Sequence, residues 1–200
     1  MGNEEFLEQW EQFLTPEILR TNLIMASVYI AAFEILKNVI VERIRDFYLI
    51  GFDNNGFIID PEYKEAVLRR NRSPVYASLD WLKEAGAITD ADIETFEQSK
   101  EYRNLLAHEL ARLLMEGLPQ DFSKRFQGMV MLLDKIEKWW IVNVDIPTNP
   151  DFDEAGEIDE ENIIPGTVIN LQMILDIALG PDERAYSYIS EFKKRVQKGY

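Results

Sequence analysis

The longest helical pattern of this 200-residue chain lies in residues 15–49, TPEILRTNLIMASVYIAAFEILKNVIVERIRDFYL. Thr15 can cap a helix, and Pro16 suits the first helical position because the N–H that proline lacks has no partner there. Neither glycine nor proline interrupts the chain again before Gly51. We therefore predict one helix about 50 Å long, at 1.5 Å per residue. Such a rod has to pack along its whole length against other helices or against a second subunit.

Shorter helical segments flank this long helix. Apolar residues recur at helical spacing in several stretches, and turn residues separate one stretch from the next. Thr89 and Asp92 resemble a capping box at the start of one of them. The predicted helices cover residues 4–14, 61–70, 74–85, 89–115 and 121–143. A small hairpin or loop insertion is predicted over residues 48–60, and the predicted fold class is an all-α, antiparallel helical bundle.

The last part of the chain has a different composition. The stretch from Asp145 to Gly166 carries eight acidic residues and no basic one, which is typical of an extended or mobile loop. Two extra C-terminal helices follow, at about 168–179 and 182–198. The predicted organisation is a helical bundle over residues 1–145, an acidic loop over 146–166, and C-terminal helices over 167–200 that pack on the bundle.

Composition excludes several classes of site. The chain has no cysteine, so disulfides, thiolate zinc sites and cysteine nucleophiles are excluded, and its single histidine excludes any site built from two histidines of one chain. No nucleotide-binding glycine loop and no zinc-protease motif is present. We therefore expect no metal and no cofactor.

The net charge of −15 argues against a general nucleic-acid or anionic-membrane binder. The acidity is concentrated, however, because residues 139–183 contain 11 acids and no base, and the rest of the chain is nearly balanced. A local RNA site is compatible with that distribution. The acidic N-terminus is unlike a secretory signal, and the apolar stretch 23–36 is short and interrupted by Glu34. We expect a cytoplasmic protein without a membrane span.

The only histidine, His108, lies five residues after Arg103, and Asn104 directly follows that arginine. This pattern resembles the signature of the HEPN superfamily, helical proteins that include many metal-independent ribonucleases and toxins. In this chain the motif lies on the long helix predicted over residues 89–115, which is expected to pair with the long helix that begins at residue 15, and this setting extends the resemblance over roughly residues 15–145.

The resemblance implies catalytic roles for Arg103, Asn104 and His108, with RNA as the substrate. It further implies cleavage to a 2′,3′-cyclic phosphate and a 5′-hydroxyl, and a role as a toxin or antiphage effector with an antitoxin protein as partner. In HEPN proteins the motifs of two subunits meet at a two-fold interface, so a homodimer is implied. One departure concerns the Tyr that some HEPN toxins carry two residues after the His, since this chain has Leu110 there.

The residue types suit RNA cleavage without a metal. Imidazole titrates near neutrality and can transfer the proton of a ribose 2′-hydroxyl. Guanidinium stays charged and can bind two phosphate oxygens at once. On a helix with 100° per residue, Asn104 and His108 share a face, whereas Arg103 lies about 140° from His108. A second copy of the helix across a two-fold axis could complete the site.

Two other interpretations remain open. The chain could be a non-catalytic module of the same fold that binds a partner protein or a nucleotide, or an unrelated helical scaffold dimer. In the scaffold interpretation, Arg103 pairs with Glu109 or Glu101, and His108 is partly buried. A polar cleft where Arg103 and His108 converge at a two-fold interface would favour the nuclease, and a cleft without that convergence would favour the non-catalytic module.

Arg69, Arg70 and Arg72 form the densest early basic run and are candidates for binding the RNA backbone. A solvated helix end explains the same run equally well. Glu34 interrupts the apolar pattern of the long helix, either as an acid that faces the site or as a surface residue that pairs with Lys37.

Overall fold

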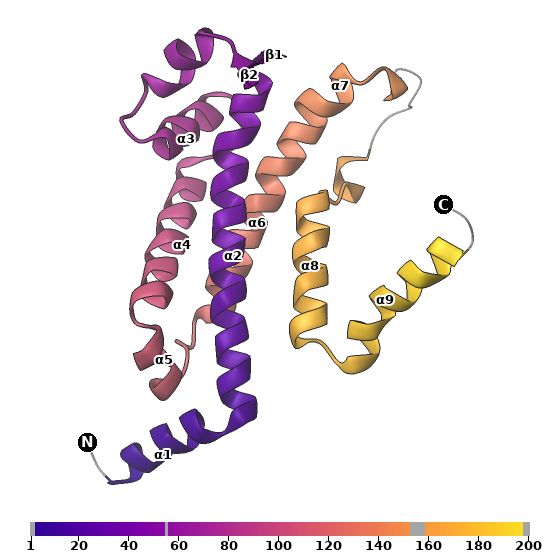
Figure 1. Cartoon of the computed structure of the whole chain (residues 1–200). Coiled ribbons are helices and arrows are strands. Elements are labelled where there is room, and N and C mark those ends of the chain that lie inside the picture. The colour runs from indigo at the N-terminus through magenta and orange to yellow at the C-terminus, as the bar shows by residue number, and fades with distance from the viewer. Residues whose placement is uncertain (1–2, 55, 153–158, 198–200) are drawn as a thin grey trace.

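The structure is a computed structural model that describes residues 3–54, 56–152 and 159–197. It is all-α apart from one two-stranded sheet, which confirms the predicted all-α character. The long helix α2 (Pro16–Phe47) forms the axis of the molecule, and other helices run beside it (Figure 1). These neighbours are α1 (Asn3–Leu14), α3 (Pro74–Glu84), α4 (Asp90–His108), α5 (Leu110–Glu116), α6 (Phe122–Trp140) and α8 (Gly166–Leu179).

The long helix begins where the sequence predicts, but Thr15 does not cap it with its side chain. Pro16 occupies the first turn, and the backbone of Thr15 is extended. The Thr15 hydroxyl instead donates a 2.6 Å hydrogen bond to the carbonyl oxygen of Glu11, near the end of α1. The hydroxyl therefore satisfies a backbone carbonyl group at the end of α1, because the two helices follow one another without a loop.

The helix predicted over residues 89–115 is broken into α4 and α5. Its start is as predicted, since the backbone N–H groups and side chains of Thr89 and Asp92 form a complete capping box. Glu109 then departs from helical geometry, with φ −112° and ψ 15°. The break turns α5 so that it packs against α1 and α2. No glycine or proline marks this turn, so sequence periodicity does not reveal it.

A β-hairpin follows α2, as predicted. Strand β1 (Leu49–Asp53) pairs with β2 (Gly56–Ile59) in antiparallel register, with Phe52 opposite Phe57. The helix predicted over 61–70 is a single π-helical turn, η1 (Lys64–Leu68), which packs on α3. These elements lie at the end of α2 that is distant from α1 (Figure 1).

The core lies along α2. Tyr29, Leu36, Ile40 and Ile44 of this helix are completely buried. Apolar side chains from α3, α4 and α6 cover them, and burial of such surface is the main favourable term in folding. Helices of the same chain therefore pack along α2, as expected for so long a helix.

The start of the predicted acidic loop is helical. Helix α6 continues through a π-helical turn, η2 (Ile141–Asp145), into α7 (Ile146–Thr148) and the 3₁₀ turn η3 (Pro150–Phe152). Asp145 accepts a 2.7 Å hydrogen bond from Arg43, which ties this segment to α2. Part of the predicted loop, residues 153–158, lies outside the described residues, and a second 3₁₀ turn, η4 (Glu160–Asn162), precedes α8.

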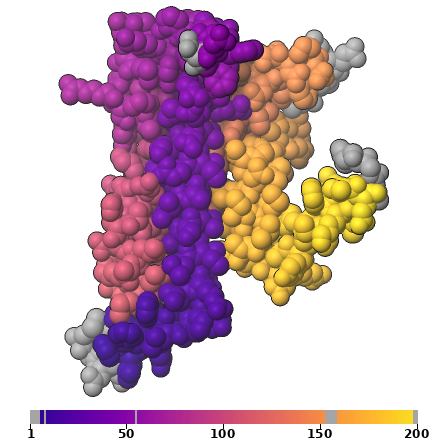
Figure 2. All heavy atoms as spheres, viewed as in Figure 1, coloured from indigo at the N-terminus to yellow at the C-terminus, as the bar shows by residue number. Residues whose placement is uncertain are grey.

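The two C-terminal helices differ in how they pack. Helix α8 lies against α2 and α6, whereas α9 (Asp182–Gln197) packs on α8. Helix α9 stands away from the bundle, as the ribbon and the space-filling view both show (Figures 1 and 2).

Among the described residues, two segments have the length and hydropathy of a membrane span, Pro16–Phe47 and Glu160–Leu179. In the first, 44% of the apolar window is buried inside the bundle, and in the second 17% is buried. The core helix of a soluble protein passes the same test, so length and composition alone do not place either segment in a membrane. A cytoplasmic location stays a prediction.

Candidate functional site

Helix α4 carries all three residues of the Arg–Asn–His motif. The capping box fixes its start, and Phe96, Tyr102 and Leu106 bury one side of it against the core. This burial turns the intervening positions Arg103 and Asn104 towards the boundary between α4 and α2, where both are partly exposed. The motif therefore begins on a rigid, well-packed part of the helix.

Arg103 forms an ion pair with Glu34 on α2. One guanidinium nitrogen, Nη2, lies 2.6 Å from Oε1 of Glu34, and the other, Nη1, donates a 3.1 Å hydrogen bond to Oδ1 of Asn104. The guanidinium carbon lies 5.9 Å from the centre of the Phe33 ring, which is within the range of a cation–π contact. The scaffold interpretation expected Arg103 to pair with Glu109 or Glu101, and both expectations are wrong for this chain.

Glu34 has two cationic partners. Lys37 donates to Oε2 of Glu34, and Arg103 to its other oxygen. Hydrogen bonds from Lys37, which is the larger cause, and from Arg103 lower the pKa of the Glu34 carboxylate. The carboxylate is therefore held in its charged form. The two alternatives that the sequence leaves open for Glu34 are both realised, because it pairs with Lys37 and also faces the motif.

A cavity of about 220 Å³ lies beside this ion pair, and we call it the α2–α3–α4 pocket. Three helices contribute its lining residues, which are Phe33, Glu34, Lys37, Ser73, Val75, Tyr76, Phe96, Lys100, Arg103 and Asn104. The lining holds three cationic side chains and one acidic one, in a chain whose net charge is −15. A locally positive pocket in an acidic protein is suited to an anionic ligand.

Lys100 lies on the same pocket, one turn before Arg103. Its ammonium donates to the hydroxyl of Tyr76 and lies 5.0 Å from the centre of that ring. It also lies 3.3 Å from a carboxylate oxygen of Glu97. Hydrogen bonding to Tyr76 is the main reason why the pKa of Lys100 is raised. The ammonium is therefore positively charged at neutral pH, and Tyr76 and Glu97 hold it at the pocket.

His108 is the last residue of α4, directly before the break at Glu109. Its side chain is exposed and is not part of the lining of the α2–α3–α4 pocket. Within residues 3–54, 56–152 and 159–197, the side chain of His108 makes no hydrogen bond or ion pair. The motif therefore divides within one chain: Arg103 and Asn104 lie at a pocket, and His108 lies free at the helix end. The partial burial that the scaffold interpretation expected for His108 is wrong.

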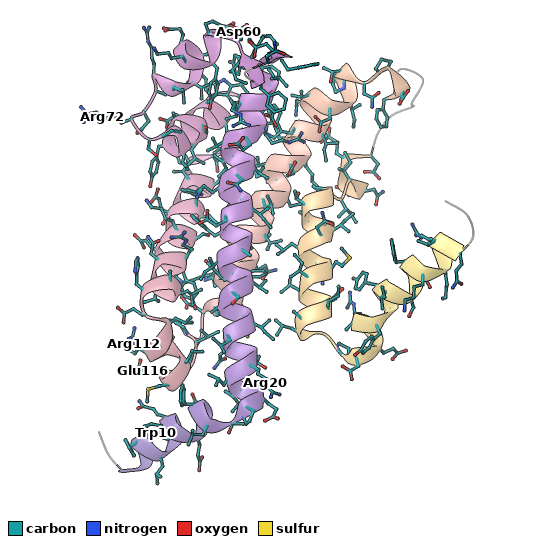
Figure 3. The ribbon with its side chains drawn as sticks, in the orientation of Figure 1. Trp10, Arg20, Asp60, Arg72, Arg112 and Glu116 are labelled. Atoms are coloured by element: carbon teal, nitrogen blue, oxygen red, sulfur yellow. The ribbon has the colours of Figure 1, made fainter. Side chains whose placement is uncertain are left out.

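The basic run 69–72 is mostly engaged in ion pairs. Arg69 pairs with Glu65 one turn earlier, and Arg70 pairs with Glu84 of α3. Arg72 is exposed and points away from the molecule at the loop before α3 (Figure 3). Of the three predicted backbone-binding residues, only Arg72 has a side chain without an ion pair in the described part of the chain.

The sequence alone does not single out Tyr76 and Lys100. Lys100 precedes Arg103 by three residues, so helical spacing places the two cations on neighbouring turns. Tyr76, by contrast, comes from a different helix, and only the packing of α3 against α2 brings it to the pocket. Among the described residues, no group of three or more acidic or histidine side chains is arranged to hold a metal ion.

Comparison with models of protein families, with curated proteins and with solved structures gives no match to this chain.

Proposed function

We propose that the protein is a HEPN-like, metal-independent endoribonuclease that acts as a toxin or an antiphage effector in the cytoplasm. In this proposal Arg103 binds the phosphate, Asn104 orients the guanidinium, and His108 transfers protons. The observation that supports it best is the positive α2–α3–α4 pocket at the first two motif residues, combined with an exposed histidine at the end of the same helix.

The chemistry follows from these groups. His108 takes the proton from a ribose 2′-hydroxyl or delivers one to the leaving 5′-oxygen, a role suited to imidazole. Arg103 exchanges the carboxylate of Glu34 for phosphate oxygens and stabilises the charge that develops at phosphorus. Arg103 faces α2 of its own chain. We therefore propose that the His108 that acts together with Arg103 belongs to the second copy of a homodimer. We also propose that an antitoxin protein binds over this site.

The test is an RNA cleavage assay in EDTA with wild type, His108→Ala and Arg103→Lys. We expect His108→Ala to reduce the rate by roughly 10²- to 10⁴-fold, as is typical of a lost proton-transfer group. Arg103→Lys should also be severe, because an ammonium cannot replace the planar guanidinium at a phosphate. Arg112→Lys is the matched control, since Arg112 lies on the surface of α5 near Glu116 (Figure 3) and, among the described residues, pairs with Glu109 and Glu116 alone.

Two outcomes would contradict this mechanism. Wild-type cleavage by His108→Ala would leave the histidine without a role, and loss of cleavage in EDTA with rescue by magnesium would require a metal. Melting temperatures of the variants should stay close to that of the wild type, because His108 is exposed and unpaired within the described residues.

A second candidate is a non-catalytic helical module that binds a nucleotide or a partner protein. The ion pair between Arg103 and Glu34 favours it, because the pair joins α4 to α2 and uses the motif arginine inside the chain. The pocket exists without convergence of Arg103 and His108, which is the arrangement expected of this module. Binding of a nucleoside monophosphate that depends on Arg103 and not on His108, with no cleavage of any RNA, would support it.

A further inference from the structure

The C-terminal arm, which we define as α8 and α9, exposes a large apolar surface. Eight large apolar side chains of these two helices are between 39% and 68% exposed. They are Ile169, Ile174, Ile177, Leu179, Tyr186, Ile189, Phe192 and Val196. Contiguous exposed apolar surface in a soluble protein marks an interaction site more often than chance.

Part of this surface has the spacing of a coiled coil. Ala185, Ile189, Phe192 and Val196 follow one another at intervals of four, three and four residues, which is the d-a-d-a pattern of two heptads. Ile189, Phe192 and Val196 are exposed by 45%, 63% and 56%. We call these four positions the α9 seam.

Polar contacts join α9 to α8. The hydroxyl of Tyr188 donates a 2.7 Å hydrogen bond to the buried carboxylate of Asp176, and Nε of Arg184 lies 3.0 Å from the same oxygen. On a helix with 100° per residue, Arg184 lies about 110° and Tyr188 about 70° from the centre of the seam, both on the same side. The chain thus anchors α9 by one side and keeps its apolar side outward.

The charges of α9 are arranged for pairing with a copy of itself in the opposite direction. Asp182 and Glu183 lie at its start, and Lys193, Lys194 and Arg195 lie near its end. Antiparallel pairing places each basic end beside the acidic start of the other copy, whereas parallel pairing places like charges together. Asp182, Glu183 and Lys193 form no ion pair within the described part of the chain.

We propose that the α9 seam docks on the α9 seam of a second copy of this chain, in antiparallel order across a two-fold axis. Ala185 then lies opposite Val196 of the second copy, and Ile189 opposite its Phe192, as in the mixed a–d layers of an antiparallel coiled coil. Helices α4 and α9 lie on opposite sides of α2 (Figure 1). This contact is therefore separate from the one proposed at His108, and a chain that used both would form tetramers or longer assemblies.

The first test is the molar mass in solution. Light scattering at micromolar concentration should find the full-length wild type as a dimer or larger assembly. Phe192→Asp should remove the α9 contact, because a charge would be buried in the seam. Ser187→Asp is the matched control, since it adds the same charge on an exposed side of α9 that faces away from the seam. Circular dichroism should be the same for all three proteins.

The second test fixes the direction of pairing. The chain has no cysteine, so single cysteines report cleanly. Ala185→Cys and Val196→Cys chains, carrying different tags, are mixed and mildly oxidised. Antiparallel pairing predicts a disulfide between the two different variants, whereas parallel pairing predicts disulfides between identical ones.

Several outcomes would overturn the proposal. A wild-type monomer at all concentrations would do so, as would an assembly that Phe192→Asp does not reduce, because its contact would then lie elsewhere. A disulfide only between identical variants would exclude the antiparallel order. Co-sedimentation of a monomeric wild type, but not of Phe192→Asp, with vesicles of phosphatidylserine and phosphatidylcholine would assign the seam to a lipid surface instead. None of these results depends on RNA cleavage.

Discussion

Nη2 of Arg103 on α4 lies 2.6 Å from Oε1 of Glu34 on α2, although the two residues are 69 positions apart in the chain. The pair joins the helix that carries the Arg–Asn–His motif to the central helix of the bundle. Both side chains are about one-third exposed, so a ligand can reach them. A phosphate that binds Arg103 therefore competes with a carboxylate that already holds it.

This competition can be measured with Glu34→Gln. Because the neutral amide holds a guanidinium less strongly, the variant should bind RNA or inorganic phosphate more tightly, by roughly fivefold for a pair worth about 1 kcal/mol. Titration calorimetry with phosphate gives the affinity directly. Unchanged or weaker binding would show that Glu34 does not restrain the arginine. Glu42→Gln, which removes a surface partner of Arg45, is the control.

The same pair should contribute modestly to stability. We expect a double-mutant cycle of Glu34→Gln and Arg103→Gln, followed by urea unfolding, to give a coupling free energy of about 0.5–1 kcal/mol. The exposed pair of Arg45 and Glu42 should give less. A coupling near zero for the first pair would show that the contact between Arg103 and Glu34 does not stabilise the fold.

The capping box at the start of α4 should contribute more to the free energy of unfolding than the pair of Arg103 and Glu34. Asp92→Ala removes the acceptor for the backbone N–H of Thr89, and loss of a cap typically costs about 1 kcal/mol of unfolding free energy. Asp92 also accepts a 2.5 Å hydrogen bond from Lys135 of α6. Lys135→Met removes that contact and keeps the cap, so its smaller effect in urea unfolding separates the two contributions. Equal losses would mean that the cap contributes nothing.

The attachment of α9 should weaken in acid. Hydrogen bonding from Tyr188 is the main cause that lowers the pKa of Asp176. A lowered pKa means that this carboxylate stabilises the fold above its unfolded pKa of about 3.9, and that the contribution is lost as the pH falls through the lowered value. Asp176→Asn should therefore melt below the wild type at pH 7, and the difference should shrink below about pH 4. Glu183→Gln, on the exposed start of α9, should show no such trend.

The turn between α8 and α9 requires glycine for a steric reason. A Cβ atom at Gly180 would lie 2.3 Å from the carbonyl oxygen of Asp176, which is backbone and cannot move aside alone. Gly180→Ala should cost about 1–3 kcal/mol, as overpacking typically does, and increase hydrogen exchange in α9. Gly166→Ala is the control, because nothing lies within 4 Å of its added Cβ. Unchanged exchange in α9 would contradict this account of the turn.

Most of the helices, the hairpin and the capping box could be predicted from the sequence. Each depends on groups close together in the chain: apolar spacing of 3.6 residues, the turn Asn54-Asn55-Gly56, and the exchange of hydrogen bonds between Thr89 and Asp92. The sequence also identifies Arg103, Asn104 and His108 as candidate site residues, because their spacing defines the motif. Their catalytic roles stay a prediction.

The residues that surround the motif could not be predicted from the sequence, because they come from other helices. Glu34 and Tyr76 reach the pocket because α2 and α3 pack beside α4 with particular sides turned inward, and local periodicity does not specify which helices become neighbours. The break at Glu109 and the outward turn of α9 have the same origin. At Glu109, packing of α5 on α1 outweighs the helical preference of the local sequence. At α9, the hydrogen bond from Tyr188 to Asp176 sets how the helix lies on α8, which helical spacing alone does not specify.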